Sequence, residues 1–352
     1  MKKIIQLLLC LVFLLGITGE LFAQKNKNIV QNVQGLKELQ EEYAQQWYRK
    51  NSTTPTADEL FFHYTYKKAL EKYMEEYEKN PDGEDNVRMK LQIAECHRKL
   101  NDHKETEIWF GKVATAYESQ LQPIHKLHYA DALSSNGKYE TAKVWYEKYE
   151  KDPHNDKRGL RKTYGINNIE LFYVDSALYQ VKEINVNSEE SDFSPAYYEG
   201  GLVFSSARRP PANKKETFNW NDKSFLDLYY ADIEGGENLS EPNEFHLSVN
   251  SRFHEGTLVV YKENSKMIFT RNDYHKKKIR RSKKDVHNLS LYSADRESAE
   301  DGSETSGWTN IKPFHFDSKE YSVGHPTITK DGTRMYFASD MPGGVGGVDL
   351  YY

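Results

Sequence analysis

The fold of the second half of this chain is decided by the stretch from His325 to Tyr352, HPTITKDGTRMYFASDMPGGVGGVDLYY. The stretch predicts a strand over Thr327 to Thr329, a tight turn at Asp331-Gly332, a strand over Met335 to Ser339, a glycine loop and a strand from Asp349. An Asp-Gly pair between alternating apolar residues favours a type I′ hairpin, in which both central residues have positive φ. One hairpin buries little surface, so its meaning depends on whether it recurs.

The unit recurs twice upstream, each time as a hairpin followed by a third strand. The first copy is Pro195–Tyr198, a turn at Glu199–Gly201, Leu202–Ser206 and Asp227–Ala231; the second is Thr257–Tyr261, a turn near Asn264-Ser265, Met267–Arg271 and Ser290–Ala294. Phe204, Phe269 and Phe337 occupy one position, at intervals of 65 and 68 residues. A fourth strand is predicted before each hairpin, at Tyr179–Val186, Glu244–Val249 and Thr309–Phe316.

Four strands per repeat predict β-propeller blades, although these periods exceed the roughly 40–45 residues of a compact blade. The excess falls in three loops, Arg208–Lys223, Asp273–Asp285 and Glu297–Ser306. We therefore predict an incomplete WD40-like propeller of about three blades over residues 176–352. Because the sequence stops inside a predicted strand, we expect it to be a fragment of a longer protein.

The preceding region, residues 24–175, is predicted to be helical, because apolar residues recur with helical period and proline and glycine are few. The expected helices cover residues 58–80, 86–100, 103–118, 124–136, 139–150 and 158–172. A repeat lies within them, since Ala94, Asn101, Thr106 and Phe110 reappear 36 residues later as Ala130, Gly137, Ala142 and Tyr146. Small residues let paired helices approach closely, and the aromatic residue fills the space toward the next pair.

This pattern resembles tetratricopeptide repeats, and Leu127 to Pro153, LHYADALSSNGKYETAKVWYEKYEKDP, is the best unit. A partial earlier unit has Ala69, Tyr73 and Pro81 at matching intervals. Asn101 in place of the turn glycine and Thr106 in place of alanine depart from the pattern. The resemblance implies a helical array that binds protein segments on a concave face; packing against the neighbouring domain alone is the open alternative.

The N-terminus has the pattern of an export signal. Lys2 and Lys3 precede the 14-residue apolar run Ile4–Ile17, and Leu21-Phe22-Ala23 precedes a predicted cut at Gln24. Removal of residues 1–23 leaves no predicted membrane-spanning helix and takes Cys10 with it. Cys96 is then the only cysteine, and its helical apolar setting favours a buried structural thiol over a reactive one.

Several motifs resemble the WD40-like propeller repeat of bacterial envelope proteins. They are Asp192-Phe193-Ser194-Pro195, Phe204-Ser205-Ser206-Ala207-Arg208, Phe337-Ala338-Ser339-Asp340 and Gly343 to Tyr352, GGVGGVDLYY. A signal sequence, a tetratricopeptide-like segment and this propeller together resemble the N-terminal part of OmpA-family proteins related to the type IX secretion component PorE. The resemblance implies a further C-terminal OmpA-like domain that binds peptidoglycan and is not in this sequence.

The sequence predicts no catalytic, cofactor-binding or metal site. His246, His254 and Glu255 lie close together, and we place His325 at the blade position of Glu255, but their spacing matches no metal-ligand pattern. The basic run Lys276 to Lys284, KKKIRRSKK, could bind acidic partners, glycans or phosphate-bearing lipid head groups, and a solvated mobile insertion is the alternative.

The loop from Gly343 to Gly347 lacks the Lys-Ser/Thr of a phosphate-binding loop, so we expect it to turn the chain between strands. The acids flanking it, Asp340 and Asp349, are expected to accept hydrogen bonds from backbone amides. All five tryptophans, Trp47, Trp109, Trp145, Trp220 and Trp308, are predicted to be packing residues.

Composition narrows the function further. With a net charge of −5, the chain has no clearly basic domain, so nucleic-acid binding is not expected. We expect a non-catalytic, periplasmic, outer-membrane-associated scaffold that binds envelope proteins through the helices and the propeller and reaches peptidoglycan only through the further domain. The alternatives are the gating propeller of an exported prolyl-oligopeptidase-like peptidase, which a downstream Gly-x-Ser-x-Gly would indicate, and a TolB-like periplasmic adaptor.

Overall fold

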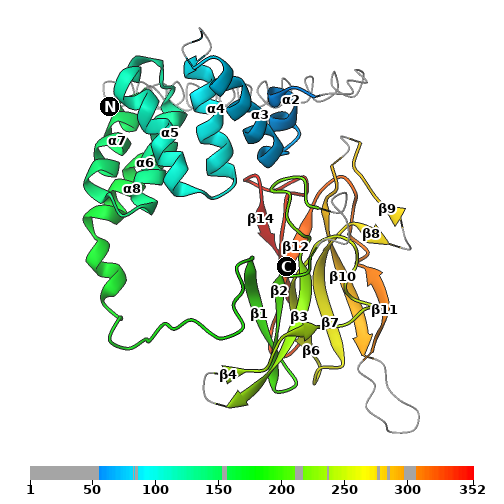
Figure 1. Ribbon diagram of the computed structural model, residues 1–352. Coiled ribbons are helices and arrows are strands. Elements are labelled where there is room, and N and C mark those ends of the chain that lie inside the picture. Colours follow the sequence, from blue (N-terminus) through cyan, green and yellow to red (C-terminus); the bar gives the residue numbers. More distant parts are fainter. Residues whose placement is uncertain are drawn as a thin grey trace, which may run out of the picture.

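The computed structural model describes residues 55–81, 83, 86–152, 157–210, 217–235, 238–275, 278–283, 286–296 and 307–352. Within this part of the chain, seven α-helices come first and antiparallel β-sheets follow (Figure 1). The predicted α-then-β order is therefore confirmed. The predicted export signal at residues 1–23, Trp47 and Pro153 lie outside the described residues.

The helical region consists of short helices that pack on their neighbours in sequence. They are α2 (Ala57–Phe62), α3 (Tyr66–Lys79), α4 (Asn86–Lys99), α5 (His103–Ala116), α6 (Pro123–Ser135), α7 (Tyr139–Lys151) and α8 (Arg158–Asn167), with 3-10 turns η1 (Glu118–Gln120) and η2 (Ile169–Tyr173). None of the helices in the described part has the length and apolar character needed to cross a bilayer. The single helix predicted over residues 58–80 is wrong, because the chain turns at Tyr64 between α2 and α3.

The same turn ends the first helix of three successive pairs. Tyr64, Asn101 and Gly137 have φ of 58°, 61° and 75°, the left-handed conformation that favours glycine. The residue after each turn donates its backbone N–H to a carbonyl five residues back: Thr65 to Leu60, Asp102 to His97 and Lys138 to Leu133. Asn101 therefore adopts the left-handed turn conformation that was predicted for glycine. Tyr64 forms the turn of a third helix pair, which the sequence pattern did not identify.

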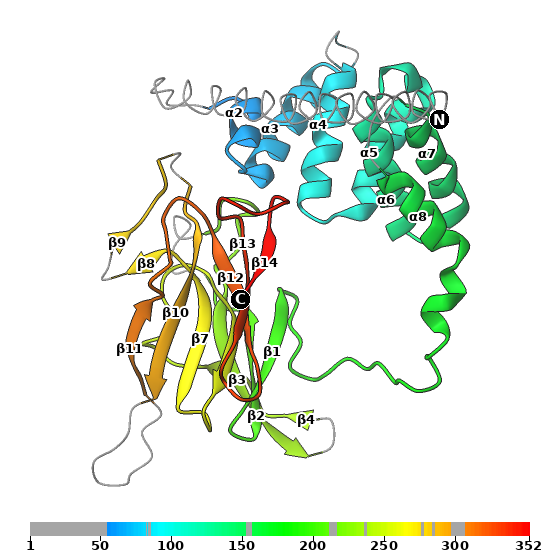
Figure 2. The ribbon, with the colours of Figure 1, turned by 180° about the vertical axis from the view of Figure 1, so that it is seen from behind.

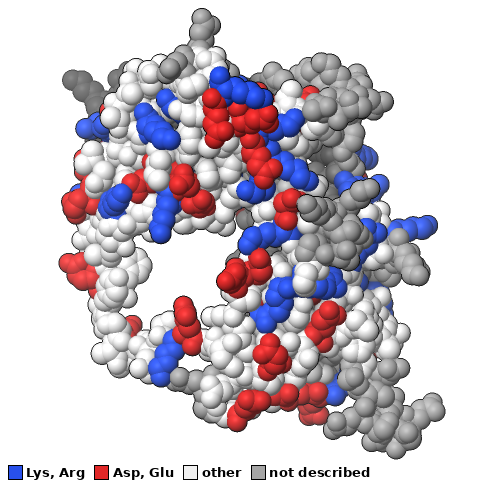
Figure 3. All heavy atoms as spheres, viewed as in Figure 1, with Lys and Arg blue, Asp and Glu red and all other residues white. Residues whose placement is uncertain are grey.

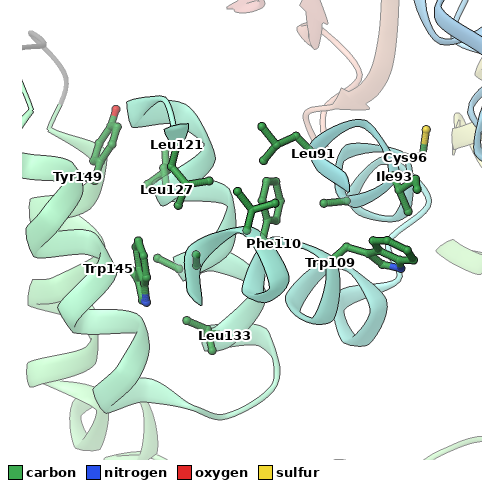
Figure 4. Close-up of a cluster of buried hydrophobic side chains, with 14 of the residues drawn as sticks. Leu91, Ile93, Cys96, Trp109, Phe110, Leu121, Leu127, Leu133, Trp145 and Tyr149 are labelled. Atoms are coloured by element: carbon green, nitrogen blue, oxygen red, sulfur yellow. The ribbon is translucent and has the colours of Figure 1, made fainter. Parts of the chain in front are cut away.

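The helix pairs share one hydrophobic core, part of which is drawn in Figure 4. The repeat residues Ala94, Phe110, Ala130 and Tyr146 are fully buried in it, as predicted from their spacing. Ala57, Ala69 and Tyr73 are the corresponding residues of the first pair, and each is at most 2% exposed. Thr106 and Ala142, the small residues of α5 and α7, are also fully buried. Cys96 is buried in the same core, which confirms a structural thiol.

The β region follows a segment without regular structure. Its strands are β1 (Asp192–Tyr198), β2 (Gly201–Ser206), β3 (Asp227–Gly235), β4 (Asn238–Leu239), β5 (Asn243–Glu244), β6 (Glu255–Tyr261), β7 (Lys266–Asn272), β8 (Tyr274–His275), β9 (Lys278–Ile279), β10 (Leu289–Arg296), β11 (Trp308–Pro313), β12 (Val323–Ile328), β13 (Met335–Ser339) and β14 (Asp349–Tyr351). The first sheet has the order β1-β2-β3, with β4 and β5 both paired to β3. The second is β6-β7-β10-β11, the third is β12-β13-β14, and β8 pairs with β9.

The three large sheets pack face to face, as both ribbon views show (Figures 1 and 2). Strand β7 is buried on both faces: Met267 and Phe269 join a cluster with the first sheet, whereas Ile268 joins Val323 and Phe337 of the third. The predicted phenylalanine position recurs in each sheet, opposite a tyrosine. The pairs are Phe204–Tyr229, Phe269–Tyr292 and Phe337–Tyr351.

Three predictions about the β region are wrong. Residues 179–186 form no strand, and only Asn243–Glu244 (β5) pairs where a strand over Glu244–Val249 was expected. The Asp331-Gly332 turn is not type I′, because of its two residues only Gly332 has positive φ, at 69°. Instead Thr329 and Arg334 close a longer loop, whose Asp331 carboxylate accepts the Thr333 backbone N–H.

Candidate functional site

The helices and sheets meet at Trp220, in the loop between β2 and β3. The indole Nε1–H donates to the Lys99 carbonyl at 2.8 Å, and the Trp220 carbonyl accepts the Lys67 N–H at 3.3 Å. Its ring stacks on Tyr64 and meets the edge of Tyr66, with centroids 6.3 and 4.7 Å away. We call Tyr64, Tyr66, Lys99 and Trp220 the interdomain seam; it joins the first two helix pairs to the first sheet.

Aromatic rings continue from the seam across the strand ends of the first two sheets. Phe218 stacks on Trp220 and meets His254 edge-on, with the Phe218 and His254 centroids 4.5 Å apart. His254 in turn contacts Phe225, and its Nδ1 accepts the Leu226 N–H at 3.0 Å. Burial lowers the pKa of His254 to about 4, with the nearby His287 acting in the same direction, so the ring is neutral at neutral pH and serves packing.

Ion pairs lie at the same strand ends. Their partners are Asp192–Arg208, Asp227–Arg209 and Glu255–Arg271, with N–O distances of 2.7, 2.8 and 3.0 Å. Burial raises the pKa of Asp227 to about 7, although the Arg209 charge acts in the opposite direction. Arg208 lies over the Phe204 and Tyr229 rings, and Arg271 lies over Phe269 and Tyr292. In each of these two sheets, the arginine side chain therefore packs over the buried aromatic rings at the strand ends through cation–π contacts.

The histidines considered as metal ligands have separate partners. His246 hydrogen-bonds Ser248 and His325 hydrogen-bonds Thr257, at 2.8 and 3.0 Å. No three His, Cys, Asp or Glu side chains in the described ranges converge as a metal site would require. The predicted equivalence of His325 and Glu255 is wrong, because strand register places Val323 at the Glu255 position: Glu255 pairs with Arg271, and Val323 with Ser339.

The described part of the basic run, residues 278–283, is attached to the second sheet. Lys278 and Ile279 form β9, which pairs with β8. The Arg280 guanidinium lies between two carboxylates, 3.3 Å from Asp273 and 3.2 Å from Asp317. Arg280 is therefore a structural residue, and the alternative of a solvated mobile insertion is wrong for it.

The predicted roles of the two acids around the glycine loop are confirmed. Asp340 accepts the Ser322 N–H at 2.6 Å, and Asp349 accepts the Gly346 N–H at 3.0 Å. Trp109, Trp145 and Trp308 are buried, as expected of packing residues. The seam role of Trp220 was missed, although Phe218, Trp220 and Phe225 give its loop an aromatic content unusual for a solvated connection.

A groove of about 570 Å³ lies at the far end of the helical region, against α8 and η2. Its lining residues are Ser134, Tyr139, Arg158, Arg161, Lys162, Gly165, Ile166, Ile169, Phe172 and Tyr173. Phe172 and Tyr173 are 77% and 63% exposed. On the face of the molecule in Figure 3, by contrast, positive and negative side chains are interspersed rather than gathered in one patch.

Comparisons with protein-family models, curated proteins and solved structures find no match to this chain.

Proposed function

We propose that this chain is a non-catalytic scaffold of the bacterial cell envelope that binds protein partners through two joined modules. The single observation that carries the proposal is the repetition of one helix-pair geometry, with left-handed turns at Tyr64, Asn101 and Gly137. Repeated helix pairs that contact only their neighbours form extended arrays with large binding surfaces. We interpret the helices as a tetratricopeptide-like array, because small and aromatic residues recur at the positions that this repeat requires.

We further propose that the sheets are adjacent blades of a WD40-like propeller. Three antiparallel meanders pack face to face, and each carries the same phenylalanine–tyrosine pair at strand positions in register. The predicted export signal at residues 1–23 supports a place in the envelope, where the resemblance to type IX secretion proteins also points. The interdomain seam supports a scaffold role, because it fixes the orientation of one binding module relative to the other.

The test places a photo-cross-linking amino acid at single exposed positions of the full chain, produced in its own cells. Tyr164 on α8 and Tyr197 on the first sheet are 67% and 79% exposed, so replacing them leaves both cores intact. Lys330, in the exposed β12–β13 loop, is the control position.

We expect the chain to fractionate with the cell envelope. The cross-linker at Tyr164 or Tyr197 should give discrete adducts of constant size, and the cross-linker at Lys330 should give no adduct. Recovery of the chain in the cytoplasm, or the absence of adducts at both test positions, would contradict the proposal.

A further inference from the structure

Within the described residues, the helical array ends with α8, which has no second helix after it to complete a pair. The sequence explains this: the 36-residue spacing puts Ile166, Tyr173 and Leu178 where the preceding pair has Ala130, Gly137 and Ala142. Neither the turn glycine nor the small residue is present, so α8 ends at Asn167 and the short turn η2 follows. Among the described helices, α4 pairs with α5 and α6 with α7, whereas α8 packs mainly on α7 and contacts α6 through the Lys162–Asp131 ion pair.

One face of α8 lines the groove described above, together with Ser134 of α6, Tyr139 of α7 and the turn η2. The lining side chains of Tyr139, Phe172 and Tyr173 are 40%, 77% and 63% exposed. A Cβ added to Gly165 would meet nothing within 4 Å, so the backbone itself borders open space there. Internal helices of the array are far better buried: Leu127, Ala130 and Leu133 of α6 are each at most 2% exposed. An apolar surface of this kind is typical of a protein contact.

The groove is lined by basic side chains, which favour a binding partner that carries acidic residues. Arg158, Arg161 and Lys162 line it, and no acidic residue is among its lining residues. Lys162 is 3.1 Å from Asp131, so its charge is already paired. Arg158 contacts the Tyr149 hydroxyl at 3.4 Å, and Arg161 is exposed. A partner segment with apolar side chains and a carboxylate facing Arg161 would therefore complement the groove.

We infer that the groove against α8 and η2 binds an amphipathic, acidic helix of a partner protein, which packs where the array would otherwise continue. We expect a helix because α2, α4 and α6, the first helices of the three pairs, each pack against the second helix of their pair. The second helix makes this contact with a small residue and aromatic residues on one face. On α7 these are Ala142, Trp145, Tyr146 and Tyr149. The inference rests on the proposed scaffold function and names the chemistry of one of its partners.

The test uses the purified full chain and two fluorescent, stapled peptides that copy the 13-residue α7 with its buried face intact. One peptide has glutamate at the remaining positions, and the matched peptide has lysine. In fluorescence anisotropy at about 50 mM salt we expect the glutamate peptide to bind at least about tenfold more tightly, and to weaken at about 500 mM salt.

Two variants locate the binding. Arg161→Glu should weaken the glutamate peptide about tenfold, because an attraction at the rim becomes a repulsion. Phe172→Ser removes an exposed ring and should weaken both peptides. Lys104→Glu, the same charge change at an exposed position of α5, should alter neither. Circular dichroism of each variant verifies that the helices remain folded.

Equal binding of the two peptides, or Arg161→Glu binding like the unmodified chain, would overturn the inference. Two further results would also overturn it. If the chain self-associates and Phe172→Ser abolishes that association, the groove binds a second copy of the chain. If the chain floats with anionic vesicles and Arg161→Glu abolishes flotation, the groove binds a membrane. If the peptides fail while Tyr197 still cross-links in cells, this inference alone is wrong. If the glutamate peptide binds but no position cross-links, the proposed function is wrong.

Discussion

At the scale of single residues, the helical array depends on three left-handed turns occupied by different amino acids. Gly137 adopts φ of 75° without strain, whereas Asn101 and Tyr64 adopt similar angles with a side chain present. Asparagine tolerates this conformation better than other non-glycine residues, and tyrosine does not. The Tyr64 ring stacks on Trp220, so its unfavourable backbone conformation is offset by a contact that joins the two regions.

The first prediction concerns Gly137. Gly137→Ala should destabilise the helical region by about 1–2 kcal/mol, because alanine is disfavoured at this φ. Gly165→Ala is the matched control: it lies inside α8 with no atom near its added methyl, so it should stabilise by about 0.5–1 kcal/mol. Urea denaturation followed by helical circular dichroism measures both changes, and the same sign for both would contradict the turn assignment.

Residue patterns also show how far the sequence alone could go. The small and aromatic positions of two helix pairs were predictable, because Ala94, Phe110, Ala130 and Tyr146 recur at a fixed interval. The turn at Tyr64 was not predictable, since tyrosine gives no turn signal and its conformation depends on a tertiary contact. The seam role of Trp220 was equally hidden, because a loop residue acquires its partners only when distant segments meet.

At the scale of elements, the strands of the three hairpins were predicted well, and each of them has a partner strand in the described chain. The second strand at Met335–Ser339 was predicted to the residue. The segment over Tyr179–Val186 has the composition of a strand but no ladder partner, and a lone strand leaves its backbone groups unpaired. Its end is nevertheless fixed: Val186 is buried on the first sheet, and the Asn185 amide hydrogen-bonds the Leu239 backbone in both directions.

The second prediction concerns the buried ion pair that connects the strands β6 and β7. Glu255 is fully buried, and Arg271 is its ion-pair partner at 3.0 Å. Arg271→Met should cost about 3–5 kcal/mol, because it leaves a buried carboxylate without its counter-charge. Adding Glu255→Leu should recover most of that loss.

The control for this prediction is Lys266→Met. Lys266 pairs with Asp295 at 2.5 Å near the other end of the same strand, but both side chains are more than a third exposed. It should therefore cost no more than about 1 kcal/mol. Hydrogen exchange of the β6 and β7 amides reports the change locally. If the double variant were as unstable as Arg271→Met alone, the pair would matter through ring stacking on Phe269 and Tyr292 rather than through charge.

At the scale of the whole molecule, the two regions are joined by the chain on one side and by the interdomain seam on the other. The connecting segment, residues 174–191, runs around an opening that Figure 3 shows between helices and sheets. Most side chains along it are exposed, including Tyr179 at 73% and Val181 at 96%, whereas Val186 is buried on the first sheet. The connection therefore does little to hold the regions in one orientation, and within the described residues that task falls to Trp220 and its neighbours.

The third prediction follows from this arrangement. Trp220→Ala removes the indole hydrogen bond to Lys99 and the ring contacts with Tyr64 and Tyr66. We expect the regions to separate, seen as a larger radius of gyration in small-angle scattering and faster proteolysis within residues 174–191. Each core should keep its stability, because Trp220 belongs to none of the hydrophobic clusters of the two regions. Tyr179→Ala, an aromatic truncation outside the seam, should leave the scattering unchanged; an unchanged profile for Trp220→Ala would show that the seam does not fix the orientation.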